Sequence, residues 1–298
     1  MGNVLRRDFL KLTAAGTASA PLVPAFSGPK PVAYHSAYER VDLGKTGIRP
    51  TRLCFGTGIR SINRNSDLLR KGRAYAVRLI RQAYERGIRC FDMADSYGSH
   101  LPVAEALAPF PRDSYVLFTK IWWRKGGIPD KDKGPVPVLI ERFLRELRSD
   151  YIDLVQLHCV DNPTWPEDLA DKMEGLERAK QEGKIRAHGV SMHAFSAIHR
   201  TPSVPWVDAA HVRINPYGKV MAGPVKRNMQ EIKKMHDRGK GVIGIKILGE
   251  GALSNSPEKI DNSIATALKS GIIDILDIGF LSLDQIDDIA RRIAKVEK

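Results

Sequence analysis

Three apolar, β-branched stretches of the chain each end in a polar residue whose side chain could do chemistry. Asp92, Lys120 and His158 close these stretches, and Tyr97 follows Asp92 closely. A carbonyl that accepts a hydride develops negative charge on its oxygen and needs a proton donor within hydrogen-bond reach. An Asp, a Tyr, a Lys and a His brought together at neighbouring strand ends therefore indicate acid-assisted hydride transfer to a carbonyl.

Each of the four residue types has a task in such a reaction. Tyr97 would be the proton donor, although a free tyrosine has a pKa of about 10, which matches neutral pH poorly. A cationic Lys120 beside it would lower that pKa, and Asp92 would keep Lys120 charged and oriented. His158, if neutral, could donate a hydrogen bond to the same oxygen. Taken singly, each residue also has an ordinary structural explanation, as a strand cap, a core side chain or a solvated end.

The elements that must position these residues alternate along the chain. Segments of helical period repeatedly end in glycine, directly before a short Val-, Ile- or Leu-rich run, at Gly87, Gly183, Gly239 and Gly271. Glycine tolerates the left-handed conformation that ends a helix. Helix starts are predicted at Ser256, which is followed by Pro257, and at Thr164, where Glu167 completes a possible capping box.

Eight apolar runs alternate with helix-like segments. They lie near residues 52–56, 88–92, 115–120, 152–158, 185–191, 207–214, 242–247 and 273–278. Strict alternation implies parallel strands, and eight units in this length predict an α/β fold of the closed (β/α)8 TIM-barrel type, whose active sites lie at the carboxyl ends of the strands. An open doubly wound sheet is the alternative, disfavoured because no Gly-x-Gly-x-x-Gly follows a strand. Residues 41–47 predict a small hairpin that caps the barrel bottom.

The first residues do not follow this alternation. The pair Arg6-Arg7 is followed by Phe9, Leu10 and a mildly apolar stretch rich in small residues. This pattern is similar to a twin-arginine export signal, and the stretch is too short to span a membrane. We expect residues 1–28 to be the signal peptide, 29–40 a linker and 41–298 one barrel domain. The expected partner is the twin-arginine export machinery, and the expected location is periplasmic or otherwise extracytoplasmic.

Composition excludes several other classes. Hydrophobic residues make up 43% of the 298 residues, enough for a large buried core. The net charge of +13 is spread along the chain with acidic residues between the basic ones, so a nucleic-acid partner is not expected. The cysteines Cys54, Cys90 and Cys159 have apolar neighbours and no metal-ligand spacing, which indicates buried thiols. Stable membrane insertion is not expected either.

The local settings of the four residues resemble those of the aldo/keto reductase family. The similarity extends from near residue 40 to residue 298 and rests on Leu53-x-Phe55-Gly56-Thr57-Gly58, Phe91-Asp92-x-Ala94-x-x-Tyr97-Gly98, Thr119-Lys120, Asp153-Leu154-x-Gln156-Leu157-His158 and Gly189-Val190-Ser191. The resemblance implies that the four polar residues form the catalytic tetrad of an oxidoreductase. It also implies a nicotinamide cofactor, NADP or NAD, and a small aldehyde, ketone or sugar-type carbonyl, or the corresponding alcohol, as substrate.

Cofactor contacts are also assigned by this resemblance. They are expected from residues at the strand ends: Gly56, Thr57, Asp92, Ser191, His211, Lys246, Leu248, Gly249, Gly279 and Gln285. Met192 and His211 stand where the family usually has Asn and Gln. Gly279 and Gln285 stand where members that bind a 2′-phosphate often carry Lys and Arg, which leaves the choice between NAD and NADP open.

The residues after Lys120 are candidates for the substrate pocket, and two other functions remain open for the barrel. Trp122 and Trp123 directly follow Lys120 and could line the substrate pocket. A barrel that binds a ligand without catalysis is one alternative, motivated by the altered cofactor positions. A metal-dependent hydrolase or isomerase using His158, His193 and His211 is the other, although no carboxylate-rich set accompanies these histidines. No metal is expected in the main hypothesis.

Overall fold

The computed structural model describes residues 32–61 and 63–298. The predicted signal peptide, 1–28, lies outside the described residues, as does the first part of the predicted linker. Residues from Ala33 to Lys298 form one compact unit, and the fold below is that of this unit.

Eight parallel strands close into a barrel in sequence order, which confirms the predicted TIM-barrel fold. The strands are β1 (Leu53–Gly56), β2 (Cys90–Asp92), β3 (Val116–Ile121), β4 (Ile152–Val160), β5 (Ile185–Met192), β6 (Ala209–Arg213), β7 (Gly241–Ile245) and β8 (Ile275–Gly279). Closure is made by β1 and β8, where Leu53 pairs with Leu276 and Gly56 with Gly279. An open sheet would leave these two strands unpaired, so the alternative architecture is wrong.

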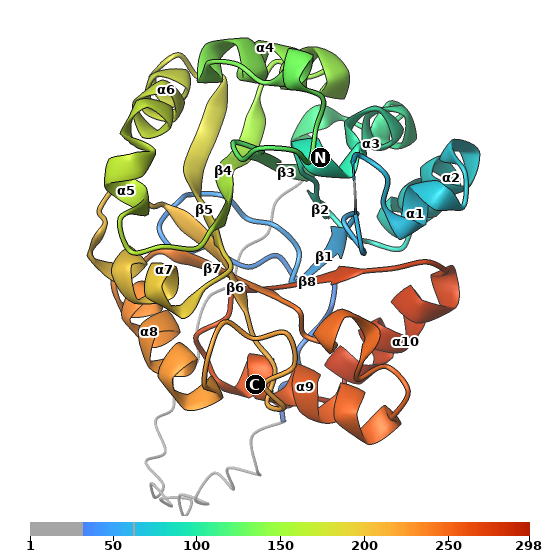
Figure 1. The fold of residues 1–298 in the computed structure, drawn as a ribbon. Coiled ribbons are helices and arrows are strands. Elements are labelled where there is room, and N and C mark those ends of the chain that lie inside the picture. Colours follow the sequence, from blue (N-terminus) through green and yellow to red (C-terminus); the bar gives the residue numbers. More distant parts are fainter. Residues whose placement is uncertain (1–31, 62) are drawn as a thin grey trace, which may run out of the picture. The chain divides into compact units, whose positions relative to one another are not determined.

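Helices surround the barrel on the outside, as Figure 1 shows. They are α1 (Asp67–Arg70), α2 (Arg73–Glu85), α3 (His100–Leu107), α4 (Val136–Leu147), α5 (Trp165–Asp168), α6 (Ala170–Gln181), α7 (Phe195–Arg200), α8 (Val225–Asp237), α9 (Pro257–Lys269) and α10 (Leu283–Ile293). Each longer helix turns an apolar stripe to the strands, as Leu139, Phe143 and Leu147 do in α4. These stripes and the outer faces of the strands make the larger hydrophobic core.

The predicted helix boundaries are mostly confirmed. The glycines predicted to stop helices all have positive φ: Gly87, Gly183, Gly239 and Gly271. Ser256 accepts a hydrogen bond from the backbone of Lys259, as predicted for the start of α9. The capping box at Thr164 is wrong, because the Thr164 hydroxyl donates to Asn162 and Asp168 and makes no cap hydrogen bond to the helix backbone.

A smaller apolar cluster fills the lower part of the barrel interior. It contains inward residues near the starts of the strands, such as Phe118 and Ile243, together with Leu43 and Ile48. The backbone of Leu43 donates to Ile48, so the predicted hairpin is present, and both side chains are fully buried. The hairpin therefore closes the barrel at the end opposite to the predicted site.

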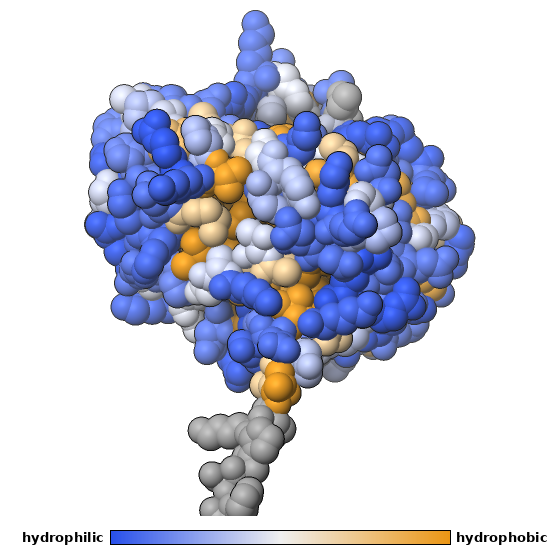
Figure 2. Space-filling view, turned by 90° about the horizontal axis from the view of Figure 1, so that it is seen from below, coloured by the Kyte–Doolittle hydropathy of each residue, from blue (hydrophilic) through white to orange (hydrophobic). Residues whose placement is uncertain are grey.

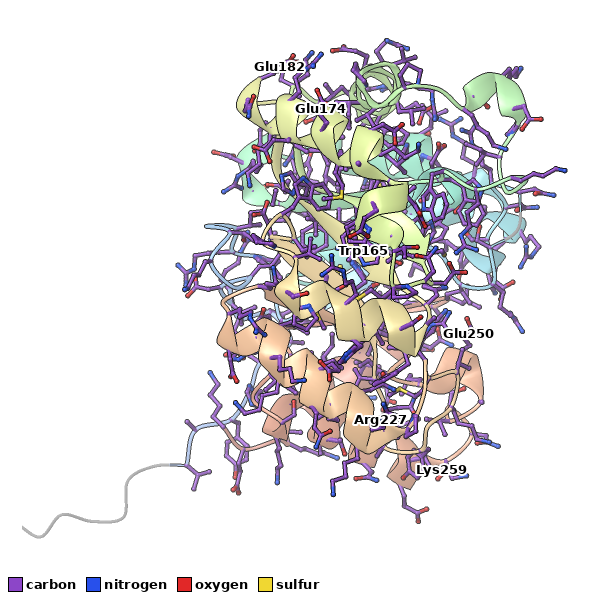
Figure 3. All side chains as sticks on the ribbon, turned by 60° about the vertical axis from the view of Figure 1, so that its left-hand side comes forward. Trp165, Glu174, Glu182, Arg227, Glu250 and Lys259 are labelled. Atoms are coloured by element: carbon purple, nitrogen blue, oxygen red, sulfur yellow. The ribbon has the colours of Figure 1, made fainter. Side chains whose placement is uncertain are left out.

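Charged and polar residues dominate the face shown in Figure 2, with hydrophobic residues in small separate groups. Figure 3 shows charged side chains projecting from the outer helices, for example Glu174 on α6, Arg227 on α8 and Lys259 on α9. In the described part of the chain, no helix combines the length and the apolar character needed to cross a bilayer.

Candidate active site

The alternation of strand side chains explains why polar groups meet above the apolar interior. Cys90 and Phe118 point into the lower barrel. Asp92 and Lys120, two residues further along β2 and β3, point the same way one layer higher. Both are buried, at 2% exposure each. The apolar layer is therefore followed directly by a charged one.

Asp92 and Lys120 form a buried ion pair. The Lys120 Nζ lies 2.5 Å from each carboxylate oxygen of Asp92 and also donates to the carbonyl oxygen of Met93 at 2.9 Å. Burial opposes ionisation of Asp92, but the Lys120 ammonium and His211 outweigh it and hold the pKa of the carboxyl below its usual value. Asp92 and the carbonyl oxygen of Met93 thus fix the orientation of the Lys120 side chain.

Tyr97 reaches the same place from a short 3-10 helix, η1 (Asp95–Tyr97). Its Oη lies 3.4 Å from Nε2 of His158, and the Lys120 Nζ lies 5.3 Å from the centroid of its ring. Gly58 leaves room for the ring, since a Cβ at that position would lie 2.3 Å from it. The four residues predicted as a tetrad are thus brought together.

The charge states of Tyr97 and His158 follow from burial. Burial lowers the pKa of His158 well below 6.5, with the Lys120 charge acting in the same direction, so this ring is neutral at neutral pH. Burial, helped by the Asp92 carboxylate, raises the pKa of Tyr97 well above 10. The predicted lowering of the Tyr97 pKa is therefore wrong for this structure, because removal from water outweighs the nearby ammonium.

Some of the predicted cofactor residues lie on the inner rim of β1, β5 and β6. Ser191 and His211 are register partners on neighbouring strands, and both are buried. The Nδ1 atom of His211 has no hydrogen-bond partner in the described residues. Gly56 faces Asp277, whose Oδ1 would lie 2.6 Å from an added Cβ. The Thr57 hydroxyl donates a hydrogen bond within the protein, to the carbonyl oxygen of Asp92 at 2.8 Å.

The other predicted cofactor residues lie at the ends of β7 and β8. Lys246 is paired with Glu250. Gly249, which follows Leu248, has a φ of 57°, a conformation that favours glycine. Gln285 accepts from the backbone of Leu281 at 2.7 Å, so its side chain helps to start α10.

Gly279 shares this region with the side chain of Ile59. A Cβ on Gly279 would lie 2.3 Å from Cγ1 of Ile59. The cofactor contacts of all these residues stay predictions.

Both tryptophans lie next to His158. The Trp122 ring stands edge-on to the His158 ring, with centroids 5.4 Å apart. Trp123 donates from its ring nitrogen to the carbonyl oxygen of His158 at 2.7 Å. A cavity of about 200 Å³ is also lined by both tryptophans, with Val136 and Leu139 of α4, but by none of the tetrad. Trp122 is therefore the better placed of the two to contact a substrate at the tetrad.

Asp277 is a site residue that sequence reasoning missed. Nε2 of His211 lies 3.2 Å from Oδ1 of Asp92 and 3.7 Å from Oδ2 of Asp277. Burial and the Asp92 charge raise the pKa of Asp277 well above 3.8. The sequence does contain a signal for this residue, since Asp277 is the one carboxylate at an inward position of the apolar run 275–279.

The three histidines proposed as metal ligands do not form one group. His158 and His193 lie with Cys159, whereas His211 lies with Asp92 and Asp277. In the second group the Lys120 ammonium already binds both oxygens of Asp92. The structure therefore does not bring His158, His193 and His211 together as the metal hypothesis requires.

Comparison with known proteins gives the class to which this fold and site belong. Residues 52–293 match the model of the aldo/keto reductase family. The chain belongs to this family of oxidoreductases, and the similarity covers the whole barrel.

Individual relatives are distant. The uncharacterized oxidoreductase YrpG of Bacillus subtilis is 25% identical over 281 residues, which cover 87% of this chain and 80% of that protein. The NADH-specific methylglyoxal reductase of Escherichia coli is 30% identical over 195 residues, covering 59% of this chain and 54% of that one. The solved structure of aldo-keto reductase AKR11C1 from Bacillus halodurans has a TM-score of 0.68 at 20% identity, covering 87% and 91% of the two chains, and it supports the fold.

Proposed function

We propose that this protein transfers a hydride between a nicotinamide cofactor and a small carbonyl compound or its alcohol. The observation that carries the proposal is the contact of Tyr97 with His158, at 3.4 Å, beside the buried pair of Asp92 and Lys120. Family membership supports the same reaction class, since the relatives include reductases that act on small carbonyls.

The proposed mechanism assigns one task to each side chain. Tyr97, a neutral phenol because burial raises its pKa, holds the proton that the carbonyl oxygen receives. His158, neutral because burial lowers its pKa, donates a hydrogen bond to the same oxygen. The Lys120 ammonium stabilises the phenolate once the proton has left, and Asp92 keeps that ammonium in place.

The residues present fit a nicotinamide. Ser191 and the unpartnered Nδ1 of His211 offer polar atoms on neighbouring strands, which suits a carboxamide, because its NH2 group donates and its carbonyl oxygen accepts. When bound, the nicotinamide supplies the hydride to the carbonyl or accepts it from the alcohol.

The test joins cofactor binding to turnover. Purified protein is titrated with NADH and with NADPH by nicotinamide fluorescence, and reduction of a panel of aldehydes, ketones and sugars is followed. We expect Tyr97→Phe to lower kcat/KM by about 10²–10⁴-fold with unchanged cofactor affinity. Tyr75→Phe is the matched control, because the Tyr75 hydroxyl donates to the carbonyl oxygen of Leu281 on the outside of the barrel.

Two results would contradict the proposal. Tight cofactor binding without turnover of any carbonyl would favour the barrel that only binds a ligand. Equal turnover by the Tyr97→Phe variant would show that the proton comes from another group.

We further propose that residues 1–28 direct export by the twin-arginine route and that the cofactor is bound before export. The paired Arg6 and Arg7 motivate this proposal. Replacing both with lysine should shift the protein to the cytoplasmic fraction, and the exported protein should contain nicotinamide on extraction. Unchanged fractionation of the double variant would refute the export route.

A further inference from the structure

Arg213 lies at the end of β6 and points toward the barrel axis, as His211 does two residues earlier. Its Nη2 lies 2.7 Å from Nδ1 of His193, and its Nη1 donates to the carbonyl oxygen of Val220 at 3.4 Å. Its Nε is buried and has no partner in residues 32–61 and 63–298. The guanidinium is thus held from one side and has donors left to use.

Three other cations at this end of the barrel are compensated. Lys120 is paired with Asp92, and Lys246 with Glu250. Arg124 lies 2.5 Å from Asp161. For Arg213, by contrast, no carboxylate lies within ion-pair distance in the described part of the chain.

The groups in contact with Arg213 do not neutralise it. Burial lowers the pKa of His193 to about 3, and the Arg213 charge acts in the same direction. Burial raises the pKa of the neighbouring Cys159 thiol to about 11. Both groups are uncharged at neutral pH, so the positive charge of Arg213 remains uncompensated.

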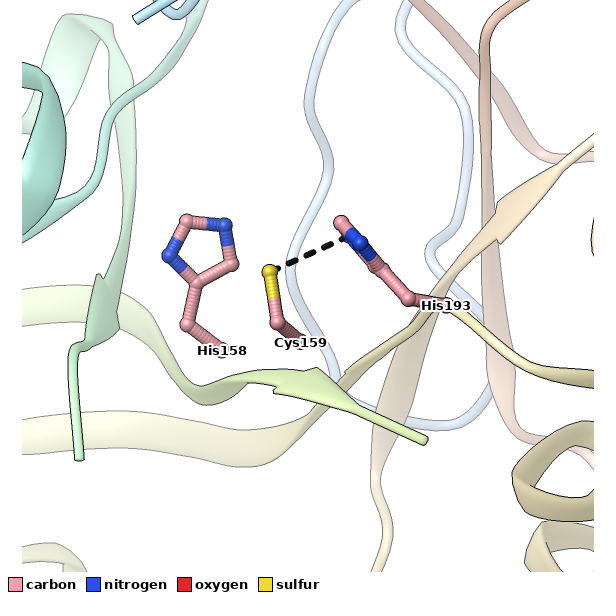
Figure 4. Close-up of side chains that lie close together, drawn as sticks. All are labelled: His158, Cys159 and His193. Atoms are coloured by element: carbon pink, nitrogen blue, oxygen red, sulfur yellow. Dashed lines mark hydrogen bonds between the residues drawn. The ribbon is translucent and has the colours of Figure 1, made fainter. Parts of the chain in front are cut away.

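Arg213 is connected to the tetrad through one imidazole ring. The His193 and His158 rings lie 6.1 Å apart between centroids, and His193 Nε2 lies 3.4 Å from Sγ of Cys159 (Figure 4). A bulge in β4 creates this arrangement, since the pairing with β5 shifts between Leu157 and Val160 and Cys159 has a φ of 59°. The guanidinium therefore lies one ring beyond the group that contacts Tyr97.

A metal ion between His158, Cys159 and His193 is the competing explanation of this cluster. Arg213 donates to Nδ1 of His193, which places the proton of the neutral ring on Nε2, the atom facing Cys159. A metal would need the lone pair of that nitrogen and a thiolate, and it would lie beside the uncompensated charge of Arg213. An anion, by contrast, is attracted by this charge.

We propose that Arg213 binds a carboxylate or phosphate group of the substrate while the substrate carbonyl lies at Tyr97 and His158. The proposal rests on the proposed function and narrows its substrate class to small anionic carbonyl compounds. A guanidinium presents parallel N–H donors that match the oxygens of either group. His193 holds the fork in position without cancelling its charge.

Matched substrate pairs test this assignment. We compare 4-oxobutanoate with butanal, and glyceraldehyde 3-phosphate with glyceraldehyde, and take the ratio of kcat/KM within each pair. Arg213→Gln should lower kcat/KM for the charged member by about ten- to a hundredfold and leave the neutral member within about twofold. Arg213→Lys keeps the charge but loses the forked geometry of the guanidinium, so its kcat/KM for the charged member should lie between those of the unaltered protein and Arg213→Gln. Arg124→Gln is the matched control, because its charge is already paired with Asp161.

A binding measurement separates this proposal from the proposed function. Calorimetric titration with succinate, which cannot be reduced in this reaction, should show binding to the unaltered protein that Arg213→Gln abolishes, even if no carbonyl is turned over. Circular dichroism and unfolding temperature establish that the variants are folded. Equal losses on both members of each pair, or weaker NADH and NADPH binding with unchanged ratios, would overturn the assignment and place Arg213 at the cofactor phosphates.

Discussion

At the scale of single residues, the buried polar layer of the barrel is held by complementary charges. The side chains of Asp92 and Lys120 are only 3% and 2% exposed, so neither is hydrated by bulk water. Removing one partner of such a pair leaves the other charge buried and alone, which costs more than the pair itself contributes.

We therefore predict that Lys120→Met destabilises the fold by about 3–5 kcal/mol. The double variant Asp92→Asn, Lys120→Met should be less destabilised than the single one, since no charge is left unpaired. Urea unfolding of Lys120→Met, Asp92→Asn and the double variant measures the coupling energy between the two residues. Additive losses would mean that the two groups do not interact in the folded protein.

Asp277 makes the stability of the fold depend on pH. Its pKa is raised by burial and by Asp92, so the folded protein keeps a proton that the unfolded chain releases near pH 3.9, which is about the usual value for Asp. The stability contributed by this group is complete below that pH and is lost as pH rises toward the raised pKa.

Asp277→Asn should remove this dependence. The difference in unfolding free energy between the variant and the unaltered protein should move in favour of the variant as pH rises from 4 to 8. Urea unfolding at several pH values measures it, and using the difference between the two proteins removes the contributions of other groups. A difference that does not change with pH would show that Asp277 is ionised in the folded state.

Among the elements around the site, the loop after β1 positions Tyr97 through a residue that has no side chain. Gly58, in the loop after β1, allows the ring of Tyr97 to lie against it. Its φ is not in the left-handed region, so alanine is compatible with the backbone and only the space is lacking.

We predict that Gly58→Ala lowers kcat/KM by about a hundredfold, because a shift of Tyr97 by about 1 Å misplaces the proton donor. The matched control is Gly134→Ala, since a Cβ at Gly134 would meet nothing within 4 Å. Initial rates at saturating cofactor measure the effect. Normal activity of Gly58→Ala would mean that Tyr97 is not held by this contact.

The elements themselves could be predicted from the sequence to different degrees. All the strands were found, because apolar runs after glycine stops are a strong local signal, as at Gly239 before β7. The start of α5 was predicted correctly at Thr164, but the capping box was not, because the Thr164 hydroxyl has other partners, Asn162 and Asp168. Local pattern does not reveal which of several nearby acceptors a hydroxyl uses.

The site was predictable where residues lie at the ends of neighbouring strands, and less so where contacts cross the barrel. Asp92, Lys120 and His158 follow from strand order. The meeting of Asp277 with His211, and of Arg213 with His193, depends on barrel closure and on the β4 bulge. The charge state of Tyr97 also depends on burial, which the sequence pattern does not measure.

In the molecule as a whole, the residues that close the barrel and the residues of the candidate site lie at opposite ends of the strands. The hairpin carrying Leu43 closes the amino ends of the strands, whereas the tetrad lies at their carboxyl ends. Leu43 is fully buried against the backbone and side chains of the strand starts, and a Cβ at Gly241 would lie 2.5 Å from its Cγ.

Leu43→Ala should therefore cost about 2–5 kcal/mol of unfolding free energy, because it leaves a cavity that the closed barrel cannot fill by collapse. Below the unfolding transition, KM and kcat should stay within about twofold of the unaltered protein, since the tetrad and Arg213 are held by other strands. Val138→Ala, at an apolar residue of α4 that is 58% exposed, is the control and should change stability by less than about 0.5 kcal/mol. A loss of kcat in folded Leu43→Ala would show instead that the two ends are coupled, and that closing the barrel bottom helps to position the strand ends that carry the site.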